Sequence, residues 1–66
     1  MHIVLNGDSV ETKDGATVAT LLQQLGISGD RVAVELNIDI VPKAVYGKQL
    51  LADGDRIEIV HFVGGG

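Results

Sequence analysis

A short helical pattern in the first half of the chain most limits the folds open to it. Within residues 18–25, one valine and three leucines recur at the spacing of one face of an α-helix. Thr17 precedes them as a suitable N-cap, and Gly26 follows where a left-handed residue commonly ends a helix. A helix this short is marginal in water by itself, so its apolar face needs another surface to pack on.

The residues before this helix predict a hairpin of two strands. Residues 1–5 alternate and are rich in apolar side chains, which favours a strand. Asn6-Gly7 is a strong hairpin signal, because a type I′ turn needs a positive φ at both central positions. Asp8 is expected to continue the turn, and residues 9–12 to return as the second strand.

The residues after the helix predict three more strands. Residues 31–36 alternate in polarity, as a strand with one buried face does. Residues 39–41 form a second, short strand, which Pro42 ends because proline has no N–H for the ladder. Residues 43–48 are expected to form a 3₁₀ turn, and residues 56–62 the last strand.

This order of elements predicts an α+β fold in which the helix covers one face of a single sheet. Alternation along the strands separates the residues expected to face the helix from those that face away. The expected core comprises Ile3, Leu5, Val10, Val32, Val34, Leu36, Ile57 and Ile59 from the strands, Leu21, Leu22 and Leu25 from the helix, and Tyr46 and Leu50 from the connection before the last strand.

Four apolar residues are expected on the sheet face that points away from the helix: Val4, Ala33, Val60 and Phe62. An uncovered sheet face is normally polar, so apolar side chains there favour a patch that docks a partner. Strand propensity is the alternative explanation, since single exposed apolar residues are common. Val60 and Phe62 lead directly to the glycines at the end of the sequence, which favours the docking patch.

Composition narrows the classes of function. The 66 residues suffice for one domain, and 45% apolar with 21% charged residues is a globular balance. A net charge of −4 argues against nucleic-acid binding, which depends on clustered Lys and Arg. It is compatible with a partner that has a basic docking face, and equally with a charge that serves solubility alone. The sequence shows no signal peptide and no apolar run of the roughly 20 residues that span a membrane, so we expect a cytoplasmic protein with no membrane partner.

Side-chain chemistry offers no clear candidate for catalysis. The chain has no cysteine, which excludes a thiolate nucleophile and a cysteine metal site. His2 and His61 are expected on opposite faces, so neither a Ser–His–acid group nor a metal site is predicted. Asp53-Gly54-Asp55 predicts a turn, because it lacks the spaced oxygen ligands of a calcium loop. We therefore expect no catalytic residue, no metal ligand and no bound cofactor in this chain.

Three glycines, residues 64–66, follow the last predicted strand. The expected domain covers residues 1–63, and Gly64, Gly65 and Gly66 form a flexible tail that can enter a narrow slot in a partner. A frayed end or a cloning remnant is the alternative explanation. A carboxylate is a poor electrophile, but adenylation would convert that of Gly66 to a mixed anhydride open to a sulfur or nitrogen nucleophile. We therefore expect Gly66 to be the residue that carries a group.

The motifs of nearly the whole chain resemble those of the thiamine-biosynthesis sulfur carrier family (ThiS), part of the β-grasp, ubiquitin-like superfamily. The most specific is GDRIEIVHFVGGG at residues 54–66, in which a strand runs directly into glycines. The other motifs are the hairpin at residues 3–7, Thr17-Val18 with Leu21-Leu22 and Leu25-Gly26, VAVELN at residues 32–37, and IVPK at residues 40–43.

The resemblance implies a β-grasp fold with a mixed sheet, in a carrier that catalyses nothing itself. It implies that a ubiquitin-activating-type adenylyltransferase (ThiF-like) activates Gly66 with ATP and magnesium. A sulfur donor such as a cysteine desulfurase would then supply the sulfur of a thiocarboxylate, which thiazole synthase (ThiG-like) would use to build the thiazole of thiamine. Gly65 and Gly66 match the family's diglycine end. Ile38 stands where the family often has glycine, which leaves the turn type open at that point.

Three other functions use the same fold. They are the small subunit of molybdopterin synthase, a ubiquitin-like modifier that forms isopeptide bonds, and a β-grasp interaction module without chemistry. Molybdopterin synthase subunits tend to be longer and to carry prolines before the diglycine, where this chain has Phe62-Val63-Gly64, which favours the thiamine pathway. Gly66 at the end of the sequence is the feature expected to distinguish a carrier from an embedded module.

Overall fold

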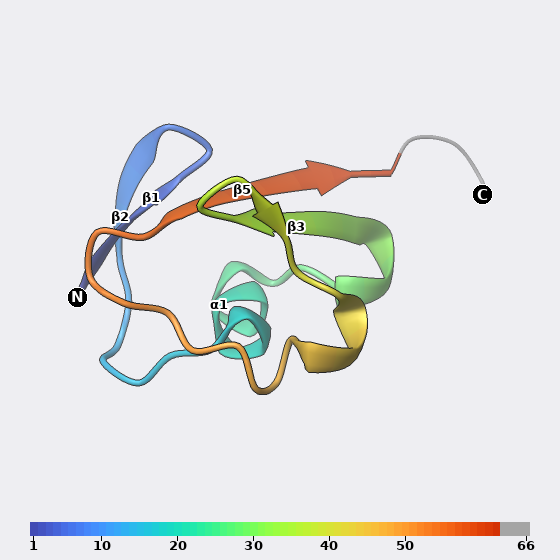
Figure 1. Ribbon diagram of the computed structural model, residues 1–66, viewed down its shortest axis with the longest axis horizontal. Helices are drawn as coiled ribbons and strands as arrows, with labels where there is room; N and C mark the ends of the chain where they lie inside the picture. Colours follow the sequence, from blue (N-terminus) through green and yellow to red (C-terminus); the bar gives the residue numbers. More distant parts are fainter. Residues whose placement is uncertain (63–66) are drawn as a thin grey trace.

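The protein forms a five-stranded mixed sheet with one helix packed across one face (Figure 1). The computed structural model describes residues 1–62, so the predicted boundary between the domain and the tail lies outside the described residues. The strand order is β2-β1-β5-β3-β4, with β1 parallel to β5 and every other neighbouring pair antiparallel. The elements are β1 (His2–Leu5), β2 (Asp8–Glu11), α1 (Val18–Leu25), β3 (Val32–Leu36), β4 (Asp39–Ile40) and β5 (Arg56–His61), with 3₁₀ turns at Gly29–Arg31 and Lys43–Val45.

The β1–β2 hairpin turns on two residues. Asn6 and Gly7 have φ values of 47° and 88°, as a type I′ turn requires. Leu5 pairs directly with Asp8, so β2 begins one residue earlier than the sequence predicts. The reason is that the two positive-φ residues reverse the chain completely and leave Asp8 in register as a strand residue.

Helix α1 is capped at both ends as the sequence predicts. The Thr17 Oγ1 accepts from the Thr20 N–H at 3.2 Å, and the Thr20 Oγ1 accepts from the Thr17 N–H at 2.8 Å, which makes a reciprocal capping box. Gly26 ends the helix with φ 71°, and its N–H donates to the carbonyl oxygen of Gln23 at 3.1 Å. These caps fix the length of a helix too short to be stable by itself.

The core lies between the sheet and α1. Ile3, Leu21 and Ile57 are its largest completely buried side chains. The expected core residues Leu5, Val10, Leu25 and Leu36 pack against its edge and are partly buried. The other members of the buried apolar cluster are Ala16, Val18, Leu22, Val32, Val34, Val41, Tyr46, Leu51 and Ile59.

The prediction that Leu50 packs in the core is wrong. Leu50 is 61% exposed, and Leu51 is buried in its place. The cause is a short extended pairing: Leu50 forms a bridge with Thr17, and the Leu51 N–H donates to the carbonyl oxygen of Ala16 at 2.9 Å. Because neighbouring side chains in an extended chain point in opposite directions, this pairing turns one leucine in and the other out.

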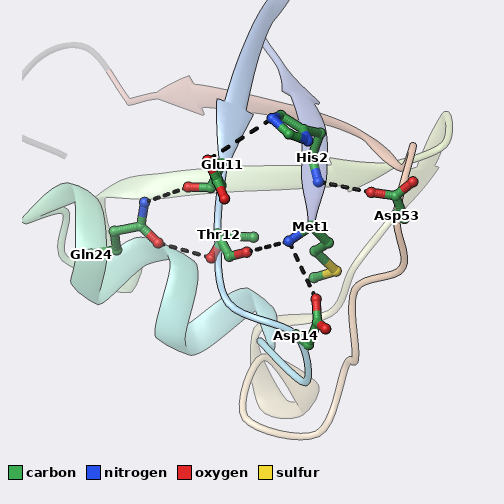
Figure 2. A network of polar contacts seen from close by, with 7 residues as sticks. All are labelled: Met1, His2, Glu11, Thr12, Asp14, Gln24 and Asp53. Carbon is green, nitrogen blue, oxygen red and sulfur yellow. Dashed lines mark hydrogen bonds and ion pairs between the residues drawn. The ribbon is translucent and has the colours of Figure 1, made fainter.

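A polar network fixes the end of the sheet where β1 and β5 begin (Figure 2). The Met1 amino group donates to the carbonyl oxygen of Thr12 at 2.7 Å and lies 3.2 Å from Asp14 Oδ1. Thr12 Oγ1 donates to Gln24 Oε1 at 2.8 Å, which joins the end of β2 to α1. The His2 N–H donates to Asp53 Oδ1 at 2.8 Å, so the loop before β5 is held as well. No helix in residues 1–62 is long and apolar enough to cross a membrane.

Candidate functional site

The strand that leads to the predicted tail occupies the centre of the sheet. β5 lies between β1 and β3, and it pairs with β3 over all but its first residue, from Leu36↔Ile57 to Val32↔His61. After the strand ends, the Phe62 N–H still donates to the carbonyl oxygen of Arg31 at 2.9 Å. The backbone is therefore held by hydrogen bonds up to the last residue that the structure describes.

Alternation along β5 divides its side chains between the two faces of the sheet. Ile57 and Ile59 are buried against the core, whereas Arg56 and Glu58 are exposed on the opposite face. Val60 is 57% exposed and Phe62 is 63% exposed, although both are apolar. We call the face away from α1 the outer face of the sheet.

The structure brings together part of the predicted docking patch. Ala33 lies directly opposite Val60 in the β3–β5 register, and Phe62 follows Val60 by two residues. Val4 lies opposite Arg56, at the other end of β5, and is half-buried. The apolar residues near the end of β5 are therefore Ala33, Val60 and Phe62, with Val4 separate from them. Their role in docking stays a prediction.

The predicted reaction site lies beyond the described residues. Gly64, Gly65 and Gly66, like Val63 before them, fall outside residues 1–62. The assignment of Gly66 as the carrier residue therefore stays a prediction. The structure describes the strand that precedes these residues. This strand, β5, is hydrogen-bonded on both sides, and the outer face beside it carries exposed apolar side chains.

Sequence reasoning missed two features, one on the outer face and one on the β3–β4 hairpin beside it. Glu35 and Glu58 lie directly opposite one another in the β3–β5 register. Ile38 and Ile40, on the β3–β4 hairpin, are 89% and 75% exposed. Alternation places both glutamates on the outer face, but the pairing register that sets them opposite one another is not contained in either segment alone.

The described residues hold no cluster that could ligate a metal. Across residues 1–62, no three His, Asp or Glu side chains lie close enough together to hold an ion. His2 lies on β1, with its Nε2 4.0 Å from Glu11 Oε1, and His61 ends β5.

Comparison with known proteins gives one family. The ThiS family model matches residues 3–66. The sulfur carrier protein ThiS of Bacillus subtilis is 46% identical over 63 residues, which cover 94% of this chain and 96% of that protein. The crystal structure of the thiamine biosynthesis protein ThiS from Geobacter metallireducens superposes with a TM-score of 0.86 at 29% identity and full coverage of both chains, which confirms the β-grasp fold.

A second kind of relative is much longer. A thiazole synthase of Paramagnetospirillum magneticum is 46% identical over all 66 residues, and the chain spans 20% of that protein's length. A thiazole synthase of Magnetococcus marinus is 44% identical, again over the whole chain and 20% of the relative. The match to the family model and the near full-length Bacillus relative together decide the assignment: the chain belongs to the ThiS family.

Proposed function

We propose that this protein is a sulfur carrier in thiamine biosynthesis and that Gly66 carries the sulfur. The observation that supports this most is the 46% identity to the Bacillus sulfur carrier over almost the full length of both chains. The glycines at residues 64–66 fit the role, because they add no side chain to a segment that must enter a partner's active site.

The chemistry takes place at one carbonyl carbon. A ThiF-like adenylyltransferase joins the Gly66 carboxylate to AMP from ATP and releases pyrophosphate, with magnesium held by that partner and not by this chain. A persulfide sulfur, derived from a donor such as a cysteine desulfurase, attacks the activated carbonyl, and AMP leaves with the former carboxylate oxygen. A thiol then cleaves the S–S bond of the resulting acyl disulfide and forms a disulfide with the donor's remaining sulfur. The result is a C-terminal thiocarboxylate on Gly66, with sulfur in place of one oxygen.

We propose thiazole synthase as the protein that consumes this sulfur. Two relatives named thiazole synthase contain a segment matching this whole chain, which makes up 20% of each. A carrier-like segment and a longer remainder thus occur in one polypeptide. This arrangement supports a functional pairing of the two, and this chain acts as carrier and co-substrate, not as an enzyme.

The described residues contribute rigidity and a docking surface to this function. β5 is held from both sides, so its direction is fixed relative to the core. A partner that binds Ala33, Val60 and Phe62 would therefore place the residues after Phe62 at a defined point. Preorganisation of this kind lowers the entropy lost when a segment is positioned for reaction.

Intact-mass measurement tests the proposal. The protein is incubated with the adenylyltransferase, ATP, magnesium and a sulfur donor, and we expect the mass increase that corresponds to replacing one oxygen with sulfur. Omitting ATP is the control and should leave the mass unchanged. An unchanged mass under conditions that convert the Bacillus carrier would refute the assignment of Gly66.

A further inference from the structure

The outer face carries a pair of like charges with no compensating ion pair. Glu35 on β3 and Glu58 on β5 are directly opposite one another in an antiparallel register. Among residues 1–62, neither carboxylate takes part in an ion pair, and the nearest cation along β5 on this face is Arg56. Like charges in this relationship destabilise a sheet, so the pair has a cost in the isolated domain.

Apolar side chains flank this acidic pair on both sides. Ile40 is the cross-strand neighbour of Glu35 on β4 and is 75% exposed. On the next outward-facing rung, Ala33 is paired with Val60, which is 57% exposed. In water, the two carboxylates attract a cation only weakly, because the solvent screens the charges. A partner that covers the surrounding apolar groups excludes water and lowers the local dielectric, which strengthens an ion pair formed with either carboxylate.

The β3–β4 hairpin contains a second unfavourable feature, a strained backbone at an exposed apolar residue, and no contact within the described domain offsets this strain. Ile38 has φ 74° and is 89% exposed, although β-branched residues rarely adopt the left-handed conformation. The Asn37 side chain holds this turn: its Nδ2 donates to Asp55 Oδ1 at 3.0 Å, and its Oδ1 accepts from the Arg56 N–H at 2.9 Å. An exposed isoleucine is thus kept in a strained and fixed position beside Ile40.

We propose that the partner-binding surface extends across the outer face from Phe62 to the β3–β4 hairpin, and that thiazole synthase places one Lys or Arg side chain over Glu35 and Glu58 with apolar side chains on either side. The choice of partner rests on the proposed function. Charge complementarity selects the basic side chain, because the acidic pair lies within a chain of net charge −4. The apolar residues that flank the acidic pair call for apolar side chains of the partner on either side of that basic residue.

Neutral variants of the acidic pair test this surface. Glu35→Gln and Glu58→Gln are titrated against the thiazole synthase of the same source by calorimetry, with Asp8→Asn as the matched control. Asp8 is an exposed acidic residue on β2, at the far edge of the sheet. Each glutamate variant should bind about 10-fold more weakly or worse, the size of loss expected for one charge contact in a covered interface, while the control changes little.

Thermal denaturation of the same variants separates docking from a structural role. Removing one of two opposed charges should leave the midpoint unchanged or raise it, so affinity and stability move in different directions. Ile38→Gly should likewise weaken binding without lowering the midpoint.

Two outcomes with the variants would overturn the inference alone. If the glutamate variants bind thiazole synthase as tightly as the wild type does, Glu35 and Glu58 have no role in docking. If Asp8→Asn loses as much affinity as the glutamate variants, the effect reflects only the general attraction between an acidic protein and a basic partner. In both cases wild-type binding and sulfur loading stay intact, so the proposed function survives. Failure of the wild type itself to bind thiazole synthase would overturn this inference and the proposed partner together.

Discussion

The side-chain amide of Asn6 takes the place of a strand beside Ile59. Asn6 Oδ1 accepts from the Ile59 N–H at 2.7 Å, and Asn6 Nδ2 donates to the Ile59 carbonyl oxygen at 3.1 Å. The two contacts lie just beyond the point where β1 stops pairing with β5, at Leu5↔Ile57. One side chain in the hairpin turn therefore continues the ladder on this side of β5, toward Val60 and Phe62.

Asn6→Gly tests this side-chain ladder. Glycine tolerates the φ of 47° at this position, so the variant removes the two amide hydrogen bonds without straining the turn. We expect a loss of about 1–3 kcal/mol in the free energy of unfolding, because the polar groups of Ile59 are left without their partner. Denaturant titration measures the loss, and hydrogen exchange of the Ile59 amide should accelerate. Equal stability of the variant and the wild type would show that water replaces the amide at no cost.

Ile38→Gly should stabilise the isolated domain. The left-handed conformation costs a non-glycine residue about 1–2 kcal/mol, which glycine avoids, and the side chain is 89% exposed, so little burial is lost. Ile38→Ala is the matched control, since it removes the exposed side chain and retains the Cβ that causes the strain. Thermal midpoints should rank glycine highest, with alanine close to the wild type. A midpoint for the glycine variant below that of alanine would contradict the strain at this turn.

Phe62→Asp should weaken binding to the adenylyltransferase or to thiazole synthase. The substitution places a charge in the apolar group formed with Ala33 and Val60, where a partner would have to desolvate it. Leu50→Asp is the control, because Leu50 is exposed to nearly the same degree, 61% against 63% for Phe62, on a different part of the chain. Binding isotherms should shift for Phe62→Asp alone. Similar affinity for both variants would show that Phe62 is an exposed apolar residue with no role in docking.

Changes in the glycine segment should stop sulfur transfer with little effect on folding. Deleting Gly66 moves the terminal carboxylate to Gly65, one residue short of the proposed reacting position, and Gly65→Val adds a β-branched side chain beside that position. The buried apolar cluster in residues 1–62 extends from Ile3 to Ile59, so the unfolding midpoint should stay within error of the wild type. Intact mass after incubation with the activating enzyme measures transfer. Sulfur loading of both variants at the wild-type rate would contradict the requirement for Gly66 and for a segment without side chains.

Local sequence patterns predicted most of the elements because each element is encoded within a few neighbouring residues. Thr17, Gly26 and the leucines between them specify α1 by cap chemistry and spacing alone. Asn6-Gly7 specifies a two-residue turn in the same way. Alternation then separated Ile57 and Ile59, which are buried, from the outward-facing residues of β5.

The remaining features depend on contacts between distant segments. Leu50 and Leu51 have the same propensity, and only the pairing of this segment with Ala16 and Thr17 decides which one is buried. The opposition of Glu35 and Glu58 likewise follows from a register between strands far apart in the sequence. For the same reason the predicted patch of four residues divides, since the position of Val4 depends on where β1 stops along β5.

The central place of β5 also sets an order of events during synthesis. Because β5 follows the other four strands of this sheet in the sequence and separates β1 from β3 in the finished sheet, a growing polypeptide cannot complete this sheet until residues 56–61 have emerged. The outer face that we expect partners to bind is assembled at the same moment, since Ala33 acquires its neighbour Val60 only then. Recognition of that face would therefore restrict sulfur loading to chains that have finished folding.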